Sequence, residues 1–212
     1  MITIKQLKDV SDFDVVVHAA RNSWGSWENS DSGYVNGEYV LGDNDYALLA
    51  KLCKAGSDHR KAIRFANVFV DITAPLSWWK QMDTYRVGTV CVSTSTMHTL
   101  ARGAITPDMF TLESRDDEII AAAAENMYNT CESFRQLYLR TNDKKYWRAL
   151  IDLLPEGFMQ TRTLMLNYEV LHNAYHSRRG HRLTEWHDFC DWVETLPYSD
   201  LITGTRGEAD ES

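Results

Sequence analysis

Apolar residues recur at helical spacing along most of the chain. The clearest segment is 116–140, where acidic residues fill the first turn, Ala121 to Ala124 favour helix and Arg140 closes the last turn. In the last such segment Thr184 is the expected N-cap and Pro197 follows the end. This last helix is predicted at 184–196. The same signals predict further helices at 12–21, 45–55, 75–85, 144–154 and 161–179.

Strand signals are few. Residues 2–7 alternate weakly and predict an edge strand, whereas 63–72 is rich in β-branched and aromatic residues and predicts a second strand. Segment 87–99 is rich in Ser and Thr, which predicts extended or looped backbone, and 26–42 reads as a loop, a candidate flap over a site. The balance favours an α+β fold, a small antiparallel sheet packed with several long helices, over a doubly wound sheet.

The totals fit one globular domain. A chain of 212 residues, 44% of them hydrophobic, can bury a core without disulfides, and we expect one domain over 1–202 with a disordered acidic tail at 203–212. The net charge of −8 argues against nucleic-acid binding. The four cysteines form no CxxC pair, which is typical of reduced thiols. With no signal peptide or bilayer-length apolar run in view, we expect a cytoplasmic protein without a membrane partner.

Several separated segments form a pattern that is specific in order and spacing. Residues 19–24 read AARNSW, and 84–96 read TYRVGTVCVSTST shortly after Gln81. Further on come Leu154-Pro155, Asn167, Asn173 and Arg178. Together they resemble the flavin-dependent thymidylate synthase family, also called the thymidylate synthase complementing proteins. That family's AARxSF-type segment and its RHRxxSxNExSxR signature fall on the first two segments without gaps. The resemblance covers about residues 19–185.

This resemblance implies a homotetramer whose active sites lie between subunits. Such a protein binds FAD, dUMP, reduced nicotinamide cofactor (NADPH) and methylenetetrahydrofolate. Reduced flavin supplies the chemistry of methyl transfer, while the protein binds, orients and polarises. We therefore expect a small-molecule nucleotide and further copies of the chain as its partners.

Carried over by position, the resemblance divides the candidate residues into two groups. Those matching flavin contacts are Ser23, Arg86, Asn167 and Asn173. Those matching positions around the nucleotide are Gln81, Thr94 and Arg178, and Arg178 is the expected catalytic residue. Ser95 joins the nucleotide group because the hydroxyl-rich stretch 93–96 can cradle a phosphate; the same stretch can equally form a β edge or a turn.

The chain departs from the signature at its charged positions. Thr84 and Tyr85 replace the first Arg and the His, Cys91 and Val92 replace Asn-Glu, and Thr96 replaces the last Arg; Glu169 stands where the family usually has another Arg. Thr cannot reproduce the bidentate fork that Arg forms on phosphate. Each lost contact of this kind costs roughly 1.5–3 kcal/mol.

Several residues keep two interpretations. Asn167 and Arg178 are expected on one face of a 161–179 helix, either as a ligand-facing ridge or as an ordinary helix face with Arg178 at its C-terminal dipole. Glu169, His172 and His176 have metal-ligand spacing, but without a further protein ligand we expect no metal and a solvated or subunit-facing surface. Cys91 is expected to be an inert buried thiol rather than a nucleophile.

Two functions from different classes follow. The first is an enzyme, a divergent flavin-dependent thymidylate synthase-like protein that binds FAD and a dUMP-like nucleotide for methyl or one-carbon transfer. The second is a non-catalytic module on the same scaffold that binds a nucleotide or another protein. The scattered flavin-side positions favour the first, and the altered signature favours the second.

Overall fold

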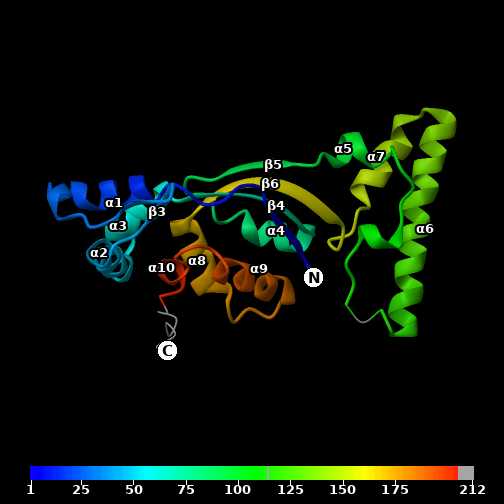
Figure 1. Ribbon diagram of the computed structural model, residues 1–212. Coiled ribbons are helices and arrows are strands. Elements are labelled where there is room, and N and C mark those ends of the chain that lie inside the picture. Colours follow the sequence, from blue (N-terminus) through cyan, green and yellow to red (C-terminus); the bar gives the residue numbers. More distant parts are fainter. Residues whose placement is uncertain (114, 205–212) are drawn as a thin grey trace.

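The structure is a computed structural model, and it describes residues 1–113 and 115–204. Its centre is an antiparallel sheet of four strands in the order β1-β4-β6-β5 (Figure 1). These strands are β1 (Thr3–Gln6), β4 (Asn67–Pro75), β6 (Met159–Asn167) and β5 (Val90–Ser93). The α+β class is therefore confirmed, with a small antiparallel sheet and many helices.

The sheet buries one face. β4 alternates up to Ala74, so that Val68, Val70 and Ile72 are wholly buried while the residues between them are half-buried. The buried face packs on helices that lie beneath the sheet in Figure 1: α4 (Leu76–Met82), α8 (Tyr168–Arg178) and α9 (Thr184–Glu194). Trp78 and Trp186, with ring centroids 4.8 Å apart, fill the centre of this core.

A second group of elements closes one end of the sheet. It holds α1 (Phe13–Asn22), α2 (Asp43–Lys54), α3 (Ser57–Arg60), the short turns η1 (Trp27–Asn29) and η2 (Lys61–Phe65), the hairpin β2 (Gly33–Val35) and β3 (Glu38–Val40), and α10 (Asp200–Thr203). Within it the wholly buried carboxylate of Asp45 accepts hydrogen bonds from the Arg21 Nε at 2.5 Å and from the Ser30 and Ser32 hydroxyls, both at 2.6 Å. These bonds fasten the start of segment 26–42 to α2.

A helical arm closes the other end of the sheet. It consists of α5 (Thr96–Thr99), η3 (Pro107–Met109), α6 (Glu118–Thr141) and α7 (Lys144–Asp152), with α6 farthest from the sheet (Figure 1). The Asp117 side chain caps the start of α6, and Asn142 ends that helix in the left-handed conformation. The arm has its own core, which includes Phe110, Leu150 and Phe158.

The structure corrects one large prediction. Residues 161–179 are not a single helix: β6 runs from Met159 to Asn167 and is the strand between β4 and β5, and α8 begins only at Tyr168. The pairing partners of β6 lie far away in sequence, and no Pro or Gly separates it from α8. Local pattern therefore could not show where the strand ends.

Smaller corrections concern element ends and exposure. The predicted strand 63–72 starts late, because 63–65 belongs to η2. The predicted loop 26–42 contains the β2–β3 hairpin. Leu183 rather than Thr184 occupies the N-cap position of α9. Cys91, expected to be buried, is exposed on β5.

The predicted tail begins within the last helix. Thr203 ends α10 and is buried, whereas residues 205–212 of the expected tail lie outside the described residues. Across the described ranges, no helix combines the length and the apolar character that crossing a bilayer requires.

Candidate functional site

The site begins where α4 ends beneath the sheet. A hollow of about 460 Å³ opens there between the chain that leaves α4 and strands β5 and β6. Its lining residues are Met82, Asp83, Tyr85, Arg86, Thr89, Cys91 and Leu164. Part of the signature segment 84–96 therefore forms a hollow wide enough to admit a ligand.

Arg178 reaches this region from the end of α8. Its Nε donates a hydrogen bond to the Tyr85 hydroxyl at 3.0 Å, and its guanidinium carbon lies 5.1 Å from the Trp186 ring centroid. The Trp186 Nε1 donates in turn to the Gln81 Oε1 at 3.0 Å. Gln81 and Tyr85, from the end of α4 and the turn after it, thus meet Arg178 of α8 around one tryptophan of α9.

The terminal amino groups of Arg178 have no hydrogen-bond partner among the described residues. The next residue, Arg179, behaves differently: it pairs with the carboxylates of Asp191 and of Glu194, the latter at 3.2 Å. Arg178 therefore keeps the fork with which a guanidinium binds a phosphate or carboxylate. This difference between neighbours supports the ligand-facing interpretation of Arg178.

Arg86 lies on the wall of the hollow and is exposed. Its Nε donates to the Asp83 carbonyl. The Asp83 carboxylate accepts from the Arg162 Nη1 at 2.9 Å, and the Arg162 guanidinium lies 4.3 Å from the Trp79 ring centroid. Arg162 thus fixes the segment that carries Arg86. Sequence reasoning missed this residue because it assigned 161–179 to a helix; the β-branched Thr161 and Thr163 were the available signal.

Asn167 holds the same segment from the other side. It is buried at 1% exposure, and its Nδ2 donates to the carbonyls of Val87 at 3.0 Å and Gly88 at 3.2 Å. Its Oδ1 accepts from the Val170 N–H at 3.0 Å and so caps α8. Gly88 has a positive φ of 70°, and a Cβ there would lie 3.0 Å from the Asn167 amide. Asn167 therefore acts within the chain, as a cap and a loop anchor.

The remaining flavin positions lie apart from the hollow. The Asn173 Oδ1 accepts from the Arg60 Nη2 at 3.2 Å, on a different face of α8. Ser23 is exposed just after α1. Among the described residues, neither lines the hollow nor hydrogen-bonds to the Arg178 cluster.

The hydroxyl-rich stretch leads from β5 into α5. The Thr94 N–H donates to the Thr161 carbonyl at 2.9 Å, which continues the sheet ladder, and the Thr94 carbonyl accepts from the Gln160 side chain at 2.9 Å. Ser95 precedes α5, and its carbonyl accepts from the Thr99 hydroxyl at 2.8 Å. The backbone of this stretch is thus engaged as a β edge and a helix start, beyond the lining of the hollow.

The expected solvated or subunit-facing surface on α8 is wrong at Glu169. This carboxylate is buried and pairs with Arg64, and its Oε1 lies 3.8 Å from the Arg60 Nε. His172 is half-buried and His176 is exposed. Over residues 1–113 and 115–204, no group of three His, Cys, Asp or Glu side chains is placed to hold a metal ion.

The fold is similar to that of a flavin-dependent thymidylate synthase and of a UMP/dUMP methylase. Flavin-dependent thymidylate synthase ThyX from Helicobacter pylori, crystallised with FAD and dUMP, matches with a TM-score of 0.73 over 96% of this chain and 98% of that chain, at 16% identity. The UMP/dUMP methylase PolB from Streptomyces cacaoi, bound with 5-Br dUMP, matches with a TM-score of 0.63 over 96% and 95%, also at 16% identity.

No family model and no curated protein matches the sequence. At 16% identity the two structural likenesses establish a ThyX-like fold alone.

Proposed function

We propose that this chain binds a pyrimidine deoxynucleotide of the dUMP type and that its reaction is FAD-dependent methyl or one-carbon transfer to that nucleotide. The observation that carries the proposal is the convergence of Arg178, Gln81 and Tyr85 beside a hollow that also presents Arg86. This convergence occurs on a fold that a ThyX and a UMP/dUMP methylase also have.

The chain's own groups suit a nucleotide monophosphate. The free amino groups of Arg178 can donate two parallel hydrogen bonds to a phosphate or to a pyrimidine carbonyl. Because Arg178 is stacked on Trp186 and held by Tyr85, little side-chain entropy remains to be lost on binding. Arg86 supplies a second positive charge at the hollow. Thr94 and Ser95 are proposed to complete the nucleotide site through their hydroxyls.

The proposed FAD contacts fit less well than the nucleotide contacts. Of the four expected positions, Arg86 and Ser23 present exposed groups, whereas Asn167 and Asn173 already bond to other parts of the chain. When bound, FAD would supply the redox chemistry that methyl transfer needs. The chain would bind and orient the nucleotide, with Arg178 polarising the pyrimidine or holding its phosphate.

The nucleotide part is tested by calorimetric titration of dUMP into matched variants. We expect Arg178→Gln to weaken dUMP binding about 10- to 100-fold, because a charged hydrogen bond contributes about 1.5–3 kcal/mol. Arg179→Gln is the control and should leave the affinity unchanged, since its partners are Asp191 and Glu194. Equal affinities for the three proteins would refute the assignment of Arg178.

The reaction is tested separately with added FAD. Binding of FAD changes the flavin absorbance band, and turnover of dUMP to dTMP with NADPH and methylenetetrahydrofolate reports the full reaction. The enzyme proposal requires both. Nucleotide binding without a flavin signal would leave a binding module as the function.

That second candidate rests on a specific observation. Arg60 donates to the amide oxygen of Asn173, and the Asn167 amide donates to the Val87 and Gly88 carbonyls. Glu169, where the resemblance implies an arginine that contacts flavin, lies between Arg60 and Arg64. A scaffold altered in this way can hold a nucleotide without redox chemistry. Thermal stabilisation by dUMP in colourless protein would be its signature.

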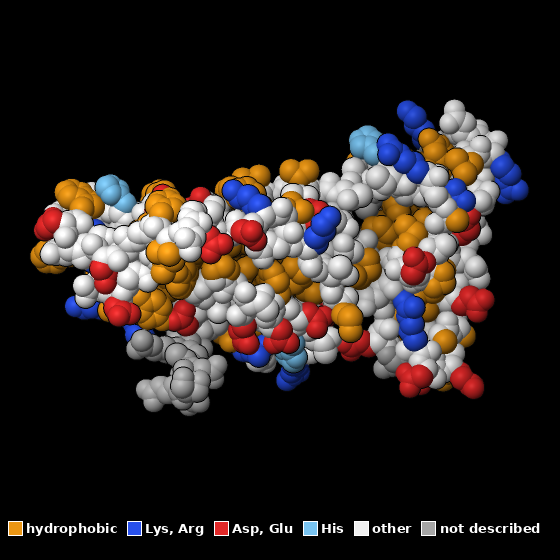
Figure 2. Space-filling model, viewed as in Figure 1, with side chains coloured by type: hydrophobic (Ala, Val, Ile, Leu, Met, Phe, Trp, Pro, Cys, Tyr) orange, Lys and Arg blue, Asp and Glu red, His pale blue; other side chains and the backbone are white. Residues whose placement is uncertain are grey.

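We also propose a homotetramer. Strand β5 beside the hollow exposes Val90 at 55% and Val92 at 67%, and an apolar hollow of about 240 Å³ lies along α6, where Figure 2 shows clustered hydrophobic side chains. Apolar patches of this kind are common at subunit contacts. Light scattering of the purified chain gives the copy number, and a monomer would refute this part of the proposal.

A further inference from the structure

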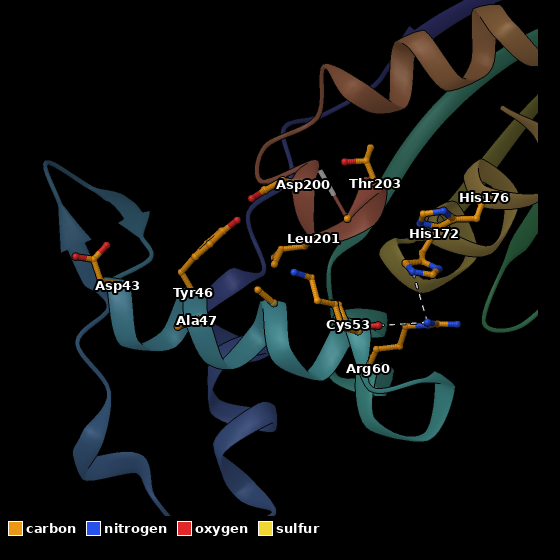
Figure 3. A pocket seen from close by; sticks show the side chains of 13 residues that line it. Asp43, Tyr46, Ala47, Cys53, Arg60, His172, His176, Asp200, Leu201 and Thr203 are labelled. Carbon is orange, nitrogen blue, oxygen red and sulfur yellow. Dashed lines mark hydrogen bonds between the residues drawn. The ribbon is translucent and has the colours of Figure 1, made fainter. Parts of the chain in front are cut away.

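A second cavity lies between α2, α8 and α10 (Figure 3). Its α8 residues, His172 and His176, lie on a different face of that helix from Arg178. Its volume of about 800 Å³ is within the range of small-molecule sites. One face of α2 forms its long wall, where Ala47 and Ala50 leave room between larger neighbours. Leu201 of α10 also lines the cavity, on the side opposite Ala47 (Figure 3).

The cavity has a basic end at Arg60. The Arg60 Nη1 donates to the Cys53 carbonyl at 3.3 Å and lies 3.4 Å from the His172 Nε2, and its Nη2 donates to Asn173. Its Nε is buried and has no hydrogen-bond partner in the described part of the chain. The nearest carboxylate oxygen, on Glu169, is 3.8 Å away, beyond hydrogen-bond distance.

His172 adds a second donor of the same kind. Because an arginine can only donate, the His172 Nε2 must accept from Arg60, which places the ring proton on Nδ1. That Nδ1 is buried and lacks a partner within the described residues. Burial first, and then the nearby Arg60 and His176, lower the pKa of His172 to about 4, so the ring is neutral at physiological pH. A buried donor without a partner costs roughly 1–3 kcal/mol, which an acceptor from a ligand would recover.

The opposite end of the cavity is acidic. Asp43 starts α2 and Asp200 starts α10, and in Figure 3 Asp43 lies farthest from Arg60 and His172, with Asp200 in between. Eleven residues of helix separate Asp43 from Lys54, which is about 16 Å. A bound anion is therefore directed to the Arg60 end and repelled from the other. Burial raises the pKa of the Cys53 thiol in the wall to about 11, so Cys53 is not a nucleophile here.

We propose that this cavity is a second ligand site, for a small organic phosphate whose phosphate oxygens bond to Arg60 and His172 and whose apolar body lies along Ala47, Ala50 and Leu201. Arg60 and His172 line the cavity, and their unpartnered Nε and Nδ1 atoms are buried, so binding requires the Arg60 side chain or the His172 ring to turn toward the ligand. Lys54, exposed at the rim, adds a positive charge at the same end. The site is independent of the proposed nucleotide site.

The proposal is tested by measuring the affinity of the protein for phenyl phosphate. Inorganic phosphate and phenol, which correspond to the two parts of that molecule, are measured for comparison. We expect phenyl phosphate to bind at least about tenfold more tightly than either half, because only it meets both ends of the site. We also expect the His172 ring nitrogens to shift in ¹⁵N NMR on binding. Equal binding of all three probes, or an unshifted His172, would overturn the proposal.

Variants locate the binding. His172→Leu and Arg60→Gln should each weaken phenyl phosphate binding about tenfold, and Lys54→Gln, a surface change that leaves the fold intact, about two- to threefold. Arg64→Gln is the matched control because it also loses a Glu169 contact but does not line the cavity. Arg178→Gln should have no effect. If binding instead follows Arg178→Gln, the probe occupies the nucleotide site and the second site does not exist.

Discussion

Two arginines, Arg21 and Arg178, show how this chain uses charge in two ways. Arg21 is 6% exposed and meets the wholly buried Asp45, whose carboxylate also accepts from two serine hydroxyls and two backbone N–H groups. Arg178 is half-exposed, touches no carboxylate among the described residues, and has a tyrosine and a tryptophan for partners.

The difference separates structural charge from charge available to a ligand. Where a buried carboxylate accepts bonds from several segments of the chain, as Asp45 does, the charge holds elements together: here it joins α1, the 30–32 segment and α2. Where a guanidinium is oriented but keeps unused donors, as at Arg178, its remaining partner comes from outside. Stability and ligand affinity should therefore respond to different substitutions.

The largest expected effect is on stability, from Asp45→Asn. The change keeps the size of the side chain but leaves the Arg21 charge buried without a counterion, which typically costs about 3–5 kcal/mol. Urea denaturation measures the loss. Asp191→Asn is the control: its partner Arg179 is 43% exposed, so the cost should stay below about 1 kcal/mol. A similar loss in both variants would contradict the structural role of Asp45.

The next effect is a pH dependence of the same group. Burial alone would raise the pKa of Asp45, but the hydrogen bonds from Ser30, Ser32 and Arg21 outweigh it and lower the pKa to about 2 from an ordinary value of 3.8. Because the folded pKa is the lower one, the stabilisation is complete above pH 3.8 and is lost as the pH falls through about 2. It amounts to roughly 2 kcal/mol.

This pH dependence is measured by urea titrations at several pH values between neutrality and pH 2. The unfolding free energy of the wild type should fall more steeply below pH 4 than that of Asp45→Asn, which lacks the titrating group. Parallel curves would show that other carboxyl groups, such as Glu132, whose pKa its bonds to Arg135 also lower to about 2, account for the acid loss.

Local signals predicted most of the helices well. In α6 the signals are local: Asp117 and Glu118 lie at the start of the helix and Arg140 lies in its last turn. Both ends of the observed helix lie within two residues of the predicted bounds. In β6 the β-branched Thr161 and Thr163 were the only local cue, and its conformation is set by pairing with β4, where Asn67 faces Asn167. A strand stabilised by partners about a hundred residues away is decided by tertiary contacts more than by propensity.

The candidate site divides along the same line. Spacing and resemblance pointed to Gln81 and Arg178, which the structure brings together through Trp186. The sequence could not show that Arg60 donates to the Asn173 amide oxygen. Nor could it show that Arg162 pairs with Asp83, because both contacts join segments that are far apart in the sequence. Residue identity at a matched position does not show whether its polar atoms are already used.

The smallest expected effect on stability sharpens the comparison most. Arg178→Gln removes one partly exposed hydrogen bond to Tyr85 and the stacking on Trp186, together about 0.5–1.5 kcal/mol of unfolding free energy. A double-mutant cycle with Tyr85→Phe, which removes only the hydroxyl, should give a coupling energy of about 0.5 kcal/mol.

If Arg178→Gln lowered the unfolding free energy by about 3 kcal/mol, Arg178 would be a structural group like Asp45. The unpartnered amino groups of Arg178 would then need an explanation other than ligand binding. A small loss in stability together with a large loss in dUMP affinity is the result that a ligand-binding arginine requires. The same pair of measurements on Arg179→Gln should show little change in either quantity, because the partners of that side chain are exposed carboxylates on α9.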